Sequence, residues 1–208
     1  MIEAVEIATS DGSILRGELR RGEADWVILV ADLGEDLDAW HALPDRLARQ
    51  GMTVLTFDLR GHGGSDGDAD PSRTATDVAD VIGFAQATGA DRIYVGAAGA
   101  TTGPVLRACE GSRCEGLFAL APRGEGLDRS SIPKLAVIGS RDPTQEAAGA
   151  ELGRSGGWPV VIRLPVRDRG CEILRGDWGA NVQDSVSAFL RDRRRSSSSR
   201  AATGKGLR

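Results

Sequence analysis

The stretch TFDLRGHGGSDG, residues 56–67, lies where an apolar run changes into a polar, glycine-rich segment. The residues just before and into it, MTVLTF at 52–57, form a short continuous apolar run, which is typical of a strand buried on both faces of a parallel sheet. Gly61, Gly63 and Gly64 follow this run. The run therefore predicts a strand that is buried on both faces.

Apolar runs of the same kind recur on both sides of this stretch, separated by segments with helical periodicity. The further predicted strands are WVILVA at 26–31, RIYVGA at 92–97, GLFALAP at 116–122, KLAVIGS at 134–140 and PVVIRLPV at 159–166, and the predicted helices cover 40–47, 102–109, 143–152, 178–190 and a segment from about 74. Alternation of buried strands and helices predicts a parallel sheet.

An alternating apolar pattern opens the chain. EAVEIAT at 3–9 and ILRGELR at 14–20 are separated by the turn residues SDG, which predicts an antiparallel hairpin. With the runs that follow, the sequence predicts an α/β protein with about eight strands in one mixed, mostly parallel sheet.

The chain divides by composition into a domain at residues 1–190 and a tail at 191–208. The tail contains seven Lys or Arg and one Asp, and because the whole chain carries a net charge of -4, the tail has six positive charges and the domain ten negative ones. Its Arg, Ser and Gly content with almost no apolar residue predicts disorder. A uniformly basic nucleic-acid-binding protein is not indicated, and contact with an anionic partner through the tail stays open.

The sequence also sets expectations for the environment of the protein. The first residues lack the basic start and long apolar run of a secretion signal, and no stretch has the apolar length of a membrane span, so a cytoplasmic protein is expected. Cys109, Cys114 and Cys171 lack metal-ligand spacing and are expected to stay reduced. We expect no metal and no cofactor.

The segment from Trp26 to Gly67, with its closing stretch DLRGHGGSD, resembles the α/β-hydrolase family. The resemblance extends from the hairpin to about Leu190 and implies an α/β-hydrolase fold, a three-layer sandwich around the central sheet. In that family the closing stretch forms a tight turn to which His62 belongs, and His62 is not the catalytic base. Only the short connection RGEGLDRSSIP at 123–133 stands where the family inserts a cap, so no cap domain is expected.

The resemblance also assigns the catalytic positions, and most of them carry residues without catalytic chemistry. The nucleophile elbow G-x-S-x-G aligns with GAAGA at 96–100, which places Ala98 at the nucleophile position. The acid position carries Asp142, which also suits a helix start before Pro143. The histidine position carries Arg169, which stays protonated, and an Asp142–Arg169 ion pair is the expected replacement.

The loop that should help to form the oxyanion hole is also altered. It aligns with Ala31-Asp32-Leu33-Gly34, and together with Gly99 the residues Asp32 and Leu33 define the expected oxyanion-loop region. A carboxylate there would oppose the charge that develops in acyl transfer. The acidic residues Asp32, Glu35, Asp36 and Asp38 are interpreted as a solvated loop and helix start rather than a cation site.

Three functions follow from the sequence, in decreasing order of support. The first is a catalytically inactive hydrolase-like protein that binds a small molecule or a protein partner. The second is an α/β-hydrolase acting on ester or amide bonds through a non-standard site or one completed by another subunit. The third is nucleotide binding through the glycine-rich loop from Gly96 to Gly103, whose spacing departs from the dinucleotide-binding pattern.

Overall fold

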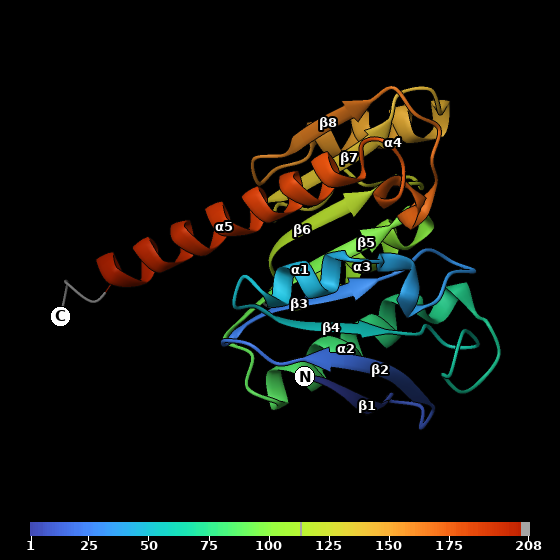
Figure 1. Ribbon diagram of the computed structural model, residues 1–208, viewed down its shortest axis with the longest axis vertical. Helices are drawn as coiled ribbons and strands as arrows, with labels where there is room; N and C mark the ends of the chain where they lie inside the picture. Colours follow the sequence, from blue (N-terminus) through green and yellow to red (C-terminus); the bar gives the residue numbers. More distant parts are fainter. Residues whose placement is uncertain (113, 205–208) are drawn as a thin grey trace.

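The computed structural model describes residues 1–112 and 114–204 and contains one eight-stranded sheet, in the order β1-β2-β4-β3-β5-β6-β7-β8 (Figure 1). The strands are β1 (Ile2–Ala8), β2 (Ile14–Arg20), β3 (Asp25–Val30), β4 (Thr53–Phe57), β5 (Arg92–Ala98), β6 (Cys114–Leu120), β7 (Lys134–Gly139) and β8 (Val160–Leu164). β1 and β2 form the predicted antiparallel hairpin, β2 pairs antiparallel with β4, and the remaining pairs are parallel. The predicted mixed, mostly parallel sheet is confirmed.

Helices cover both faces of this sheet and complete the three layers (Figure 1). The α-helices are α1 (Leu43–Ala48), α2 (Thr74–Ala87), α3 (Thr102–Glu110), α4 (Pro143–Arg154) and α5 (Gly179–Gly204), and short 3-10 turns are η1 (Leu37–Trp40), η2 (Pro71–Arg73), η3 (Gly99–Thr101) and η4 (Gly170–Leu174). Residues 121–133, between β6 and β7, form no helix or strand, as expected for a fold without a cap.

Two apolar clusters lie on opposite faces of the sheet. Side chains of α2, α3 and α4, among them Val78 and Leu152, pack on one face. Side chains of α1 and α5, among them Leu47 and Val186, pack on the other. All six residues of β3 are buried. Because a strand inside the sheet is covered on both faces, its sequence is a nearly continuous run of apolar residues.

The C-terminal segment differs from the expected disordered tail. Helix α5 continues through residues 191–204 without a break, and it projects away from the sheet at its C-terminal end (Figure 1). Arg194 explains how the helix is held beyond the apolar core: its guanidinium pairs with Asp25 at 2.6 Å and with Glu23 at 2.8 Å. The expected boundary at residue 190 therefore falls inside one helix, and residues 205–208 lie outside the described part of the chain.

The expectation of three reduced cysteines was wrong for two of them. Cys109, at the end of α3, and Cys114, at the start of β6, form a disulfide with their Cα atoms 5.4 Å apart. They meet because the chain reverses direction between the helix and the strand that follows it. Cys171 is free and buried.

Among the described residues, no helix combines the length and the apolar character that crossing a membrane requires.

Candidate functional site

The carboxyl ends of the parallel strands bring five loops together at one edge of the sheet, where open α/β sheets bind ligands. These loops follow β3, β5, β6, β7 and β8, and they include all the positions that the sequence assigned to catalysis. The loop after β5 is described first, because the resemblance to the α/β-hydrolase family places the nucleophile position there.

The reversal of the chain after β5 occurs at Gly99. Ala98, which the sequence placed at the nucleophile position, is buried and extended, with φ -119° and ψ 141°, and ends the strand. Gly99 follows with φ 53°, in the left-handed region where residues with a side chain are strained. The apex of this strand-to-helix turn is therefore Gly99, one residue later than the sequence alignment indicates, and neither residue carries a nucleophilic group.

The space above Gly99 is filled by the carboxylate of Asp32. A Cβ atom built on Gly99 would overlap the carboxyl group of Asp32. Asp32 follows β3 and is only 4% exposed, so the expectation that it forms part of a solvated loop was wrong. A side chain at the apex of the turn and the Asp32 carboxylate cannot occupy the same place.

Two backbone amides hold one oxygen of this carboxylate. Asp32 Oδ1 accepts hydrogen bonds from the N–H of Leu33 at 2.9 Å and from the N–H of Ala100 at 2.8 Å. In the α/β-hydrolase fold, the oxyanion hole consists of an N–H from the loop after the third strand and the N–H of the residue after the nucleophile. With Gly99 at the apex, Leu33 and Ala100 stand at those two places, and both already donate to a carboxylate oxygen.

Arg123 binds the second oxygen. Its guanidinium forms an ion pair with Asp32 Oδ2, and its backbone N–H donates to the carbonyl oxygen of Gly99 at 2.9 Å. Arg123 lies just after β6 and ties the loop after that strand to the turn after β5. The sequence analysis missed this residue, because an Arg after the strand GLFALAP has no signal of its own without knowledge of its partner.

Glu35 supports the same centre from the loop after β3. Glu35 Oε2 accepts from the N–H of Asp32 at 3.1 Å, and both carboxylate oxygens lie 3.3 Å from the N–H of Cys171. Gly170 has φ 50°, and a Cβ on it would lie 2.8 Å from Glu35 Oε1. The loop after β8 therefore packs Gly170 closely against the two acids.

The residue assigned to the histidine position, Arg169, is exposed and precedes η4, whereas its neighbour Gly170 is buried and faces the acids. The next residue, Cys171, is also not a nucleophile. Burial raises the pKa of the Cys171 thiol well above its ordinary value, and the charge of Glu35 acts in the same direction. A thiol held protonated is inert in acyl transfer.

Asp142 serves as the N-cap of α4. Its side chain accepts from the N–H of Thr144 at 2.9 Å and of Gln145 at 3.4 Å. Burial raises the pKa of Asp142, but these backbone N–H groups outweigh that effect and hold the pKa below its usual range. The expected ion pair is not among those of the described residues; instead Gln145 Nε2 donates to the Asp168 carbonyl oxygen at 2.7 Å and braces the two loops.

His62 connects the glycine-rich turn to the altered loop. Its Nδ1 lies 2.8 Å from the Arg60 carbonyl oxygen, and its Nε2 accepts from the N–H of Gly34 at 2.9 Å. Asp58 anchors the same turn by accepting from the N–H of Leu37 and of Gly64, each at 2.8 Å. His62 thus has the turn role expected for it and also positions the loop that carries Asp32.

The glycines considered for phosphate binding have packing roles instead. Gly96 lies inside β5, where a Cβ would overlap the rings and methyl groups of Phe118 and Leu29. Gly103 lies within α3. Only Gly99 of this set is in a turn.

A cavity of about 320 Å³ lies beside the filled centre, between the loop after β3 and the segment after β4. It is lined by Leu33, Gly34, Leu59, Arg60, His62, Ala69, Asp70, Pro71, Thr74 and Asp77. Asp77 is buried, and its carboxylate already has a partner, because the guanidinium of Arg60 forms an ion pair with it at 2.7 Å. The remaining surface offers mainly apolar contacts.

Comparison with known proteins agrees with the fold. The model of the alpha/beta hydrolase fold family matches residues 25–98, from β3 to the end of β5. The thiohydrolase aneE of Aspergillus aculeatus is 28% identical over 174 residues, which are 77% of this chain and 54% of that protein. The chain therefore spans about half the length of this curated relative.

Solved structures show the same architecture at low identity. DcsB, in complex with its substrate analogue, has a TM-score of 0.81 at 15% identity and covers 93% of this chain and 99% of its own. A serine hydrolase without a lid from Xanthomonas campestris has a TM-score of 0.76 at 18% identity, covering 92% and 94%. Est1E of Butyrivibrio proteoclasticus, with ferulic acid bound, has a TM-score of 0.77 at 17% identity, covering 91% and 99%. The protein has the α/β-hydrolase fold, without a lid.

Proposed function

We propose that this protein is a non-catalytic member of the α/β-hydrolase superfamily that binds a small molecule. The observation that carries the proposal is the position of Asp32 Oδ1 on the N–H groups of Leu33 and Ala100. A substrate carbonyl oxygen needs those donors as negative charge develops on it. Here it would have to displace a buried carboxylate that also pairs with Arg123.

The chain also has no histidine that is free to act as a base for acyl transfer at this centre. Its two histidines are His41 and His62, and His62 uses both ring nitrogens in the turn and the loop. His41 accepts from Arg175 Nε at 2.6 Å. Loss of the nucleophile or the base alone lowers the rate of a serine hydrolase about a million-fold, so loss of both argues against triad chemistry.

The cavity beside the centre supports a binding role. Its volume of about 320 Å³ lies at the lower end of the range for small-molecule sites. Leu33, Leu59, Ala69 and Pro71 supply apolar lining. A small, largely apolar molecule is the class of ligand that fits this chemistry.

A second candidate is a hydrolase with a non-standard site, and the comparisons favour it. The relatives include a thiohydrolase, and structures of similar fold include esterases. In that case Asp32, whose carboxylate lies against Gly99, is the ionisable group that could activate water. The substrate would be an ester or a thioester.

One assay separates the two candidates. Purified wild-type protein is tested against p-nitrophenyl esters and short acyl thioesters beside Asp32→Asn and Asp36→Asn, which remove one charge each from the same loop. The binding proposal expects all three at the buffer rate. Turnover by the wild type that Asp32→Asn abolishes and Asp36→Asn preserves would overturn it and support the second candidate.

A further inference from the structure

A shallow groove of about 470 Å³ lies where α5 leaves the body of the protein, and it is lined by four arginines: Arg92, Arg191, Arg194 and Arg195. Arg92 begins β5, and the other three lie on α5. Four guanidinium groups surround this one depression. The groove lies apart from the centre around Asp32, which is at the opposite ends of the strands.

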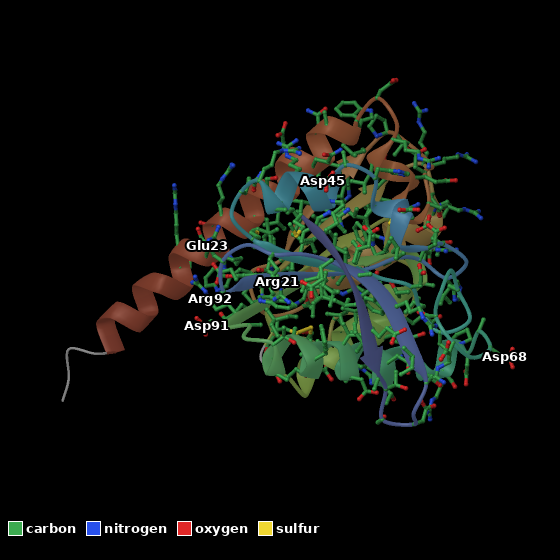
Figure 2. The ribbon with its side chains drawn as sticks, turned by 60° about the horizontal axis from the view of Figure 1, so that its bottom comes forward. Arg21, Glu23, Asp45, Asp68, Asp91 and Arg92 are labelled. Carbon is green, nitrogen blue, oxygen red and sulfur yellow. A yellow bond between two sulfur atoms is a disulfide. The ribbon has the colours of Figure 1, made fainter. Side chains whose placement is uncertain are left out.

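Two of these arginines are fixed by ion pairs. Asp25 is buried and pairs with Arg92 at 2.5 Å and with Arg194 at 2.6 Å, and Glu23 binds Arg194 as well. Arg92 also donates to the carbonyl oxygen of Arg194 at 3.0 Å. Figure 2 shows Glu23 and Arg92 beside the point where α5 departs from the sheet. The helix is thereby held in place at the groove.

The other two arginines face solvent. Arg191 and Arg195 are exposed, lie one helical turn apart, and take part in none of the ion pairs found among the described residues. Guanidinium groups bind phosphate oxygens with two parallel hydrogen bonds, which lysine cannot do. A pair held one turn apart on a fixed helix suits anionic groups arranged along a line.

We propose that this surface, formed by Arg92, Arg191, Arg194 and Arg195 on the projecting part of α5, binds the phosphate backbone of nucleic acid. Arg193 adds a further positive side chain on the same part of α5, and residues 191–195 contain four Arg and one Asp. The ten net negative charges of residues 1–190 restrict contact to this surface. A lipid surface fits less well, because residues 191–204 contain only two alanines as apolar residues and have no face to insert.

Binding of this type depends on charge and carries no sequence preference. The test uses fluorescence anisotropy of the full chain with labelled 20-base-pair duplexes of two unrelated sequences, at low and at moderate salt. The test variant is Arg191→Gln with Arg195→Gln, which leaves the ion pairs of Arg194 intact. The matched control, Arg141→Gln with Arg167→Gln, removes the same charge from exposed positions at the far ends of β7 and β8. Circular dichroism checks that all variants keep their helix content.

The proposal expects equal binding of both duplexes and about tenfold weaker binding by the groove variant. The slope of the logarithm of the binding constant against the logarithm of the salt concentration should be lower in the variant, as expected for about two fewer phosphate contacts. The control variant should bind like the wild type. Equal weakening by both variants, or no saturable binding at low salt, would overturn the proposal. So would binding to anionic vesicles without binding to the duplex.

Discussion

Asp32 and Ala100 are joined by a hydrogen bond of 2.8 Å from the backbone N–H of Ala100 to Asp32 Oδ1, across 68 residues of sequence. The same oxygen accepts from Leu33, and the other oxygen pairs with Arg123. Under the proposed function, these are the two donors that a hydrolase of this fold keeps for its substrate, and the protein places its own carboxylate on them.

Gly99→Ala should destabilise the protein strongly. The substitution forces a residue with a side chain into φ 53° and places its Cβ in the Asp32 carboxylate. We expect a loss of about 3 kcal/mol in the free energy of unfolding, measured in urea. Gly89→Ala is the matched control, because Gly89 has φ 104° but open space around it, and it should cost about 1 kcal/mol. Equal losses would show that Asp32 does not fill the space above Gly99.

Asp32→Asn should destabilise the protein by about 2 kcal/mol. The change leaves the guanidinium of Arg123 without its charged partner, and the loss is smaller than for a fully buried pair because Arg123 is about one-third exposed. Asp36→Asn is the control, since Asp36 is exposed and its role as N-cap of η1 is filled equally well by Asn. A change within experimental error for Asp32→Asn would mean that the pair with Arg123 contributes nothing.

Lys134 should make stability rise between pH 8 and 10.5. Its ammonium is buried and donates to Ser130 O, Ser155 Oγ and Gly156 O, and burial lowers its pKa from 10.5 to about 8. Between those values the unfolded chain binds more protons than the folded one, so raising the pH favours folding, by up to about 3 kcal/mol.

The measurement is urea denaturation of wild type and Lys134→Met across this pH range. The difference in unfolding free energy between the two proteins should grow in favour of the wild type as the pH rises. A constant difference would show that Lys134 has an ordinary pKa in the folded state. Comparing the two proteins removes the contributions of other groups, such as Cys171.

His41 should titrate below its ordinary value. Desolvation lowers its pKa and the charge of Arg175 lowers it further, against the opposing charges of Glu35 and Asp38. Since the unfolded chain then binds the proton more readily, this group lowers stability as the pH falls below about 6.5.

The check is a proton NMR titration of the His41 ring in wild type and Arg175→Leu. We expect the pKa of His41 to lie below 6.5 in the wild type and to rise in the variant, because the variant removes the guanidinium that donates to Nε2. An unchanged pKa in Arg175→Leu would leave desolvation as the sole cause.

Most of the architecture was predictable, because burial on both faces of a central strand produces an apolar run that is visible in the sequence. The order of strands and helices was predicted in this way, the hairpin from its alternating pattern, and the absence of a cap from the resemblance to the α/β-hydrolase family. The extension of α5 was not, because it depends on Arg194 meeting Asp25, 169 residues earlier in the chain. Local composition carries no information about such a contact.

The site was predictable in outline and wrong in detail. The sequence placed Asp32 in the loop after the strand at 26–31, but it treated the acid as solvated, since nothing near it in sequence reveals Arg123 or the N–H of Ala100. The apex at Gly99 was missed by one residue, because the length of β5 decides where the chain turns, and pairing with β6 extends that strand through Ala98.

The most direct test of the central claim is the amide NMR spectrum of wild type and Asp32→Asn. An N–H that donates to a carboxylate is a strong, charge-assisted donor, and its proton is correspondingly deshielded. The account predicts that the amide protons of Leu33 and Ala100 both resonate downfield in the wild type and both move upfield in Asp32→Asn, with no such change in Asp36→Asn. Amide protons of Leu33 and Ala100 that stay in place when Asp32 is neutralised would contradict it.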